Sequence, residues 1–86
     1  MKNFRAEIDV MPHKELLDPK GKAVESNMKN LELSEIKSVR IGKHISLLVE
    51  ASNENEAREK VQKACKLLLA NPVLESFQFE IFSPGS

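Results

Sequence analysis

Apolar and polar residues alternate in three segments of this chain, and this alternation constrains the fold more than any other feature. Between Phe4 and Val10, apolar side chains take every even position and charged side chains every odd one. Between residues 39 and 49, five of the six odd positions are apolar, and Lys43 is the exception. A third alternation includes Phe77 and Ile81. Because successive side chains of a strand point to opposite faces, each segment predicts a strand with one apolar face.

The middle segment has more than one interpretation. A two-residue hairpin at Gly42-Lys43 would place apolar residues of one arm beside polar residues of the other. A three-residue loop over 42–44 would preserve the faces, but its glycine would come first, where a left-handed residue is not expected. A single strand from Ile36 to Glu50, bent or bulged at Gly42, keeps the apolar side chains on one face. The sequence therefore favours one long bent middle strand.

Two helices are predicted between the strands. Asp18-Pro19 is a helix start, because the carboxylate can accept from the free N–H groups of the first turn and proline there needs no donor. Asn53 followed by Glu56 resembles a capping box, and Asn71-Pro72 ends that helix. The predicted fold class is therefore α/β (α+β), a two-layer sandwich in the order β-α-β-α-β with both helices on one face of a small sheet. We expect a single domain over residues 1–82 and a loose tail over 83–86.

The size and charge of the chain exclude several classes of protein. Its 86 residues, 41% of them hydrophobic, supply one small core, and a chain this short buries only about 60–65% of its unfolded surface. Thirteen basic residues balance thirteen acidic ones, whereas a nucleic-acid-binding domain usually has a basic excess. The N-terminus, from Met1 to Arg5, lacks the continuous apolar run of a secretion signal. The longest apolar run, Leu67 to Ala70, is too short to span a membrane. We therefore expect a cytoplasmic protein that binds neither nucleic acid nor membrane and associates with other chains.

The residues that usually carry chemistry are not arranged for it. His13 and His44 lack a metal-ligand spacing and are expected at the surface or an interface. Cys65 lies on the apolar stripe of the second helix, where a buried core residue is expected. Glu7 and Asp9 share the polar face of the first strand, which favours an exposed sheet face or a dimer surface over acid–base catalysis. The sequence predicts no catalytic residue, cofactor site or metal site on this chain.

Three segments of the chain resemble one known family. They are LLDPKGKAVE at 16–25, VRIGKHISL at 39–47 and LLANPVLES at 68–76. In order, spacing and total length they are similar to the PurS family, the small subunit of phosphoribosylformylglycinamidine (FGAM) synthase. Lys20 stands where that family commonly carries glutamine. The resemblance covers essentially the whole chain.

The resemblance implies a non-catalytic assembly subunit of an ATP- and glutamine-dependent ligase of purine biosynthesis. Such a subunit links a synthetase (PurL-type) and a glutaminase (PurQ-type) subunit, aids ammonia transfer, and forms a homodimer or homotetramer. It implies no cofactor on this chain, with ATP and Mg used by the synthetase subunit. The alternative is a dimeric small-molecule-binding regulatory module, which would need a polar cluster at a dimer groove.

Packing leaves two features unexplained: the glycine in the capped first turn of the first helix, and the bend in the middle strand. We expect both to form protein–protein contacts, in which the glycines permit close backbone approach and an arginine supplies a directed donor. The candidate interface residues are Asp18, Pro19, Gly21, Lys22, Arg40 and Gly42. The other interpretation is that they are only a helix start and a strand bulge.

Overall fold

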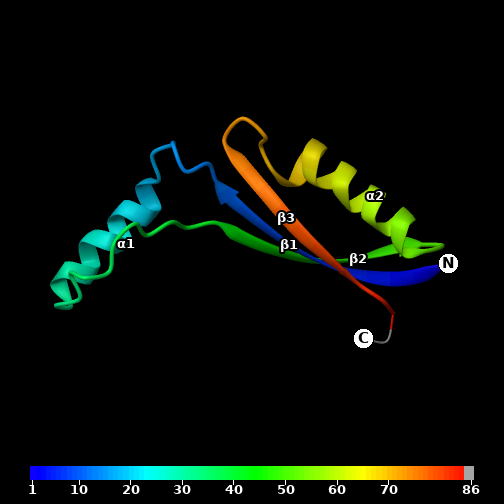
Figure 1. Cartoon of the computed structure of the whole chain (residues 1–86), viewed down its shortest axis with the longest axis horizontal. Coiled ribbons are helices and arrows are strands. Elements are labelled where there is room, and N and C mark those ends of the chain that lie inside the picture. The colour runs from blue at the N-terminus through cyan, green and yellow to red at the C-terminus, as the bar shows by residue number, and fades with distance from the viewer. Residues whose placement is uncertain (85–86) are drawn as a thin grey trace.

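The computed structural model describes residues 1–84, so the last two residues of the predicted tail, 85–86, lie outside the described part. Along the chain it contains β1 (Lys2–Pro12), α1 (Pro19–Asn30), β2 (Lys43–Ala51), α2 (Glu54–Ala64) and β3 (Glu75–Phe82). A π-helical turn, Cys65–Leu69, continues α2 (Figure 1). The predicted order β-α-β-α-β is confirmed.

The three strands form one antiparallel sheet in the order β2-β1-β3. Ile8 in the central strand lies opposite Ile45 of β2 and Phe79 of β3. With a side-chain period of two, this register places the apolar residues of all three strands on the same face. The alternation in the sequence therefore predicted the faces of the sheet correctly.

Helix α2 covers the apolar face of the sheet and completes the core. Its Val61 and the adjoining Cys65 are buried against Ile8 and Val10. The helix begins as predicted, because the side-chain oxygen of Asn53 accepts a hydrogen bond of 2.9 Å from the Glu56 backbone N–H. Cys65 is a core residue, as expected, and its burial raises the pKa of the thiol.

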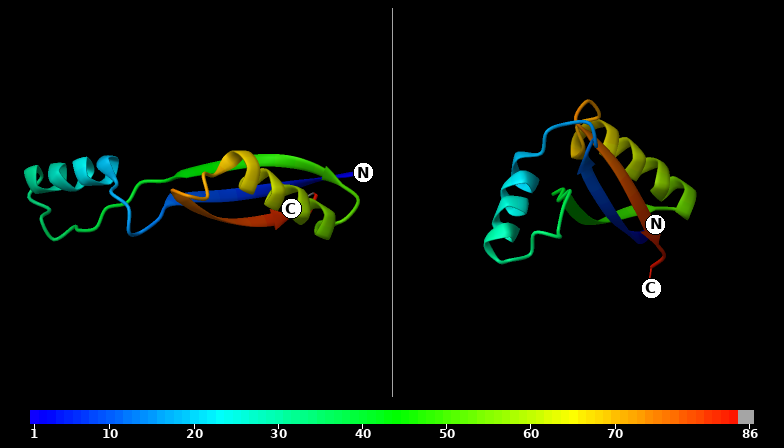
Figure 2. Two further views of the ribbon diagram at one scale, coloured as in Figure 1. Left: turned by 90° about the horizontal axis from the view of Figure 1, so that it is seen from above. Right: turned by 60° about the vertical axis from the view of Figure 1, so that its left-hand side comes forward.

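Helix α1 does not lie on the sheet, which corrects the prediction that both helices share one face. Together with the connecting residues it forms an arm, residues 13–42, that projects from the end of the sheet where β1 finishes (Figures 1 and 2). All of α1 is described, and Gly21 is its one buried residue. Without a broad apolar stripe, α1 has little to bury against the sheet.

The prediction of one long bent middle strand is also wrong. The strand was predicted to begin at Ile36, but β2 begins only at Lys43. Residues 36–42 run alongside α1 instead of continuing the sheet. Their backbone donors are used by the arm: Val39 donates to the Glu25 side chain at 3.2 Å and Ile41 to Asp18 at 2.8 Å. Side-chain carboxylates thus replace the ladder that a longer strand would have needed.

The arm makes the molecule long and thin, with principal extents of 52 × 29 × 13 Å. Its radius of gyration is 16.7 Å, whereas a compact domain of this length has about 12 Å. Seen from above in Figure 2, the arm and the sheet occupy opposite ends of the long axis.

Candidate functional site

Asp18 joins two of the segments that carry the family resemblance. It caps α1 from an extended backbone conformation, and its Oδ1 accepts from the Gly21 N–H at 3.0 Å. Its Oδ2 accepts from the Ile41 N–H at 2.8 Å, across 23 residues of sequence. The hydrogen bonds from Gly21 and then Ile41 lower the pKa of the Asp18 carboxyl. One carboxylate therefore fixes the start of the helix to the segment that returns to the sheet.

Both unexplained glycines make close approaches within the chain. A Cβ on Gly21 would overlap the carbonyl oxygen of Val39, and a Cβ on Gly42 would overlap the carbonyl oxygen of Val10. Neither position has a backbone dihedral that requires glycine. A larger residue is excluded at both because there is no space for a side chain next to Cα. The close approach that the sequence analysis assigned to a partner is thus occupied by this chain's own backbone.

Two further ties hold the returning segment in place. Glu25 accepts from the Val39 N–H in the middle of α1, and the Arg40 guanidinium donates to the Pro12 carbonyl at the end of β1. Arg40 therefore donates within its own chain in this structure, and the contact with a partner expected of it stays a prediction.

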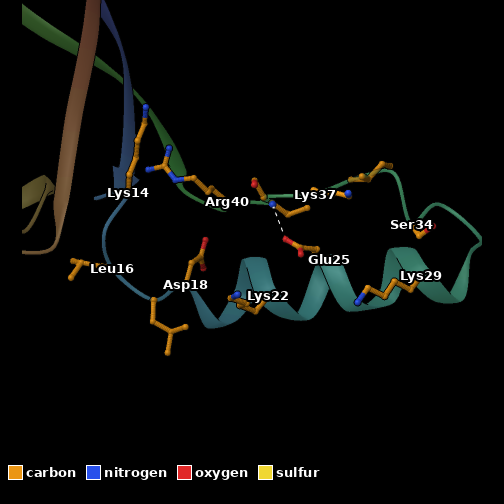
Figure 3. Close-up of a pocket in the computed structure, with 13 residues that line it drawn as sticks. Lys14, Leu16, Asp18, Lys22, Glu25, Lys29, Ser34, Lys37 and Arg40 are labelled. Atoms are coloured by element: carbon orange, nitrogen blue, oxygen red, sulfur yellow. Dashed lines mark hydrogen bonds between the residues drawn. The ribbon is translucent and has the colours of Figure 1, made fainter.

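An open groove runs between α1 and the returning residues 34–40 (Figure 3). Its volume is about 830 Å³. Its charged lining residues are Lys14, Asp18, Lys22, Glu25, Lys29, Lys37 and Arg40. The five cations outnumber the two carboxylates by three, and both carboxylates already accept backbone hydrogen bonds. This lysine groove is therefore suited to bind carboxylate or phosphate groups through charge.

The third resembling segment reaches the base of the same arm. The backbone N–H of His13 donates to the Leu74 carbonyl at 2.9 Å, and Nε2 of the His13 ring lies 3.1 Å from the Pro72 carbonyl oxygen. Leu74 and the exposed Leu17 help to line a second open pocket, of about 700 Å³, at this junction. All three segments therefore meet where the arm leaves the sheet.

The predicted interface residues fall into two groups. Asp18, Lys22 and Arg40 line the lysine groove, whereas Pro19 borders the second pocket and Gly42 packs at the start of β2. Gly21, as described above, supports the contact between helix and returning segment. Four further charged residues of the groove were not predicted from the sequence: Lys14, Glu25, Lys29 and Lys37. One available signal was the seven-residue spacing of Lys22 and Lys29, which places both on one helix face.

A separate polar cluster lies on the sheet face opposite α2. His44 places Nδ1 2.7 Å from Asp9 Oδ1 and Nε2 3.5 Å from Glu7 Oε1. These hydrogen bonds, first to Asp9 and then to Glu7, raise the pKa of His44. The exposed position of His44 agrees with the surface histidine expected. Within residues 1–84, no three His, Cys, Asp or Glu side chains are arranged to hold a metal ion.

Comparison with known proteins agrees with the convergence of the three segments. Residues 5–83 match the family described as PurS, phosphoribosylformylglycinamidine (FGAM) synthase. The chain belongs to the PurS family. The PurS subunit of phosphoribosylformylglycinamidine synthase from Thermotoga maritima is 40% identical over 75 residues, covering 87% of this chain and 92% of that protein. The corresponding PurS subunit from Synechocystis is 39% identical over 79 residues, 92% of this chain and 79% of that protein.

Solved structures of the family share this fold. A chain in the structure of PurLQS from Thermotoga maritima superposes with a TM-score of 0.87 at 38% identity, covering 95% of this chain and 100% of that one. PurS from B. subtilis gives a TM-score of 0.81 at 32% identity, covering 91% and 96%. The predicted α/β fold class and the PurS resemblance are both confirmed. In the part of the chain that the structure describes, no helix is long and apolar enough to cross a membrane.

Proposed function

We propose that this chain is the assembly subunit of an FGAM synthase, linking the synthetase and glutaminase subunits and aiding ammonia transfer. The observation that carries the proposal is the TM-score of 0.87 with a chain of PurLQS over 95% of this chain. Membership of the PurS family favours this role over a regulatory small-molecule module. In this assembly ATP and Mg are used by the synthetase subunit, and the complex works in the cytoplasm.

The candidate site supports a role in binding other subunits rather than in catalysis. The Asp18 carboxylate already accepts from two backbone donors, and the Cys65 thiol is buried in the core with a raised pKa. A buried thiol whose pKa is raised is a poor nucleophile. We therefore assign the activated groups of the ligase to the larger subunits.

Within the predicted interface we assign two different tasks. Asp18, Gly21 and Gly42 shape the junction, because their contacts are made inside the chain. Lys22 and Arg40 are exposed on the groove and present their charge to a neighbouring subunit, although the Arg40 guanidinium also donates to the Pro12 carbonyl within the chain. Pro19, also exposed, borders the second pocket and is a further contact.

Reconstitution with the synthetase and glutaminase subunits tests the proposal. We expect glutamine-dependent synthesis to require this chain, while synthesis from added ammonia by the synthetase subunit depends on it less. Lys22→Ala together with Arg40→Ala should weaken co-elution with the larger subunits. The matched control is Lys63→Ala, which removes an exposed charge from α2, far from the arm. Full glutamine-dependent activity in the absence of this chain would refute the proposal.

A further inference from the structure

The lysine groove concentrates positive charge that the rest of the chain does not neutralise. Its four lysines, all exposed, are Lys14, Lys22, Lys29 and Lys37. Within residues 1–84, the side chains that form ion pairs with carboxylates are His44 and Lys60, and neither lies in the groove. Five of the thirteen basic residues line this one groove, although the chain as a whole has zero net charge. A local excess of this kind attracts anions.

The lysines approach the groove from both of its sides. Lys22 and Lys29 lie seven residues apart on α1, whereas Lys37 lies on the returning segment (Figure 3). Seven residues of α-helix span about 10.5 Å. An extended anion with several charged groups therefore fits these positions better than a single phosphate or carboxylate group does.

The groove has room for such a ligand. Its volume of about 830 Å³ falls within the range of about 300–1,000 Å³ that is usual for small-molecule sites. Its two carboxylates are engaged elsewhere, since Asp18 accepts from the Gly21 and Ile41 N–H groups and Glu25 accepts from the Val39 N–H. Backbone donors thus hold the acidic groups in place, while the lysines keep their donors for a ligand.

Two serines add neutral donors to the same groove. Ser34 and Ser38 both line it, and a hydroxyl can donate to an anionic oxygen. Ser38 has a left-handed backbone conformation, with φ at 59°, which few residues other than glycine adopt. Residues in such conformations collect at ligand sites. Ser38 therefore marks the part of the returning segment next to Lys37 as a place where a ligand is expected.

The types of donor favour phosphate over carboxylate. Proteins recognise carboxylates best through the two-pronged contact of an arginine, but the Arg40 guanidinium already donates to the Pro12 carbonyl. Lysine binds phosphate as a point charge. Among the described residues, no aromatic side chain lines the groove, so nothing there can stack on a nucleobase. The groove is therefore suited to a chain of phosphate groups, whatever is attached to it.

We propose that the lysine groove binds a linear polyphosphate, a chain of two or more linked phosphate groups, between Lys22 and Lys29 on α1 and Lys37 on the returning segment. Free inorganic polyphosphate and the triphosphate of a nucleotide both present this chemistry. The inference goes beyond the proposed function and is tested without the larger subunits. Lys22 is also a predicted contact for a neighbouring subunit, so the ligand lies next to that contact.

Isothermal titration calorimetry on the full chain, at low salt and with EDTA, tests the proposal with four probes. They are tripolyphosphate, ATP, inorganic phosphate and citrate. Tripolyphosphate should bind at least about tenfold more tightly than inorganic phosphate or citrate, because only an extended chain reaches several lysines at once. ATP that binds as tightly as tripolyphosphate, or more tightly, assigns a nucleotide as the ligand. Weaker binding of ATP assigns free polyphosphate, and both results support the site.

Paired substitutions locate the binding. Lys22→Gln with Lys37→Gln should weaken tripolyphosphate binding roughly 25-fold, about fivefold for each lysine removed. The matched control is Lys63→Gln with Lys66→Gln, which removes the same charge from exposed positions on α2 and the turn that follows it. The control should keep the affinity of the unmodified chain, and circular dichroism verifies that both proteins are folded.

NMR titration of the unmodified chain gives a second measurement that needs no substitution. Tripolyphosphate should shift the amide signals of Ser34, Lys37 and Ser38 and leave those of the central strand β1 in place. The proposal is overturned if tripolyphosphate does not bind, or if citrate or inorganic phosphate binds equally well. Equal weakening by the two double variants, or shifts confined to residues outside the groove, would overturn it as well.

Discussion

Replacing Gly21 by alanine tests whether close backbone approach holds the arm together. A Cβ at this position would overlap the Val39 carbonyl oxygen and would lie 2.6 Å from Asp18 Oδ2. Ordinary carbon–oxygen contacts are about 3.3–3.6 Å. The returning segment must therefore move away from α1, and the hydrogen bonds donated by Val39 and Ile41 must lengthen or break.

The cost falls on the arm and not on the sheet. Inserting a methyl group into a packed contact costs about 1–3 kcal/mol, which raises the population of the detached state roughly 5- to 150-fold. Alanine also favours the helix over glycine by about 0.8–1.0 kcal/mol. The two elements should therefore respond in opposite directions, with the returning segment loosened and α1 itself strengthened.

Amide hydrogen exchange measured by NMR separates these effects. The Val39 and Ile41 amides should exchange roughly 5- to 150-fold faster, while amides of the central strand β1 keep their rates. Ser26→Ala is the matched control, since it adds helix propensity at an exposed site of α1 without touching the returning segment. Unchanged or slower exchange at Val39 and Ile41 in the Gly21→Ala protein would refute the reasoning.

Three further predictions concern titration and the core. The raised pKa of His44 means that its stabilising contribution is complete below pH ~6.5 and is lost as pH rises through the folded pKa. The melting temperature of the His44→Gln protein should lack this dependence on pH. The lowered pKa of Asp18 means that the hydrogen bonds to its carboxylate are fully present above pH ~3.8 and are lost as pH falls through the folded pKa. Amide exchange at Ile41 should therefore accelerate in that acidic range, and Asp18→Asn should accelerate it already at neutral pH. Cys65→Ser places a hydroxyl in an apolar core and should lower the free energy of unfolding by about 1–3 kcal/mol in urea titrations, more than Cys65→Ala if the unpaired hydroxyl is the cause.

The sequence predicted the sheet faces and both helix starts, because these depend on local rules. Alternation around Ile8 fixes which side chains share a face, and the side chains of Asp18 and Asn53 cap helices from within three residues. The extent of β2 could not be predicted the same way. Val39 continues the alternation of the strand, but its N–H is taken by Glu25, a tertiary contact invisible to periodicity.

The candidate site was predicted in part for a related reason. The residues at both segments were found, but a glycine indicates only that something approaches closely, not which chain it belongs to. In this structure the approaching group at Gly21 is the Val39 carbonyl. The lysines of the groove were missed because evenly distributed charges along a sequence give no sign of gathering until α1 and the returning segment lie side by side.

The strand order β2-β1-β3 has a consequence for handling the isolated chain. Both β2 and β3 are edge strands in the described part of the molecule, so each keeps an unpaired row of backbone N–H and C=O groups. Residues 45–49 in the interior of β2 contain neither a charge nor a proline, and Lys43 and Glu50 flank them. Such a segment is prone to strand-to-strand aggregation, which those two flanking charges oppose. Expression together with its partners, which shields exposed surface from the start, should therefore yield more monodisperse protein than expression alone.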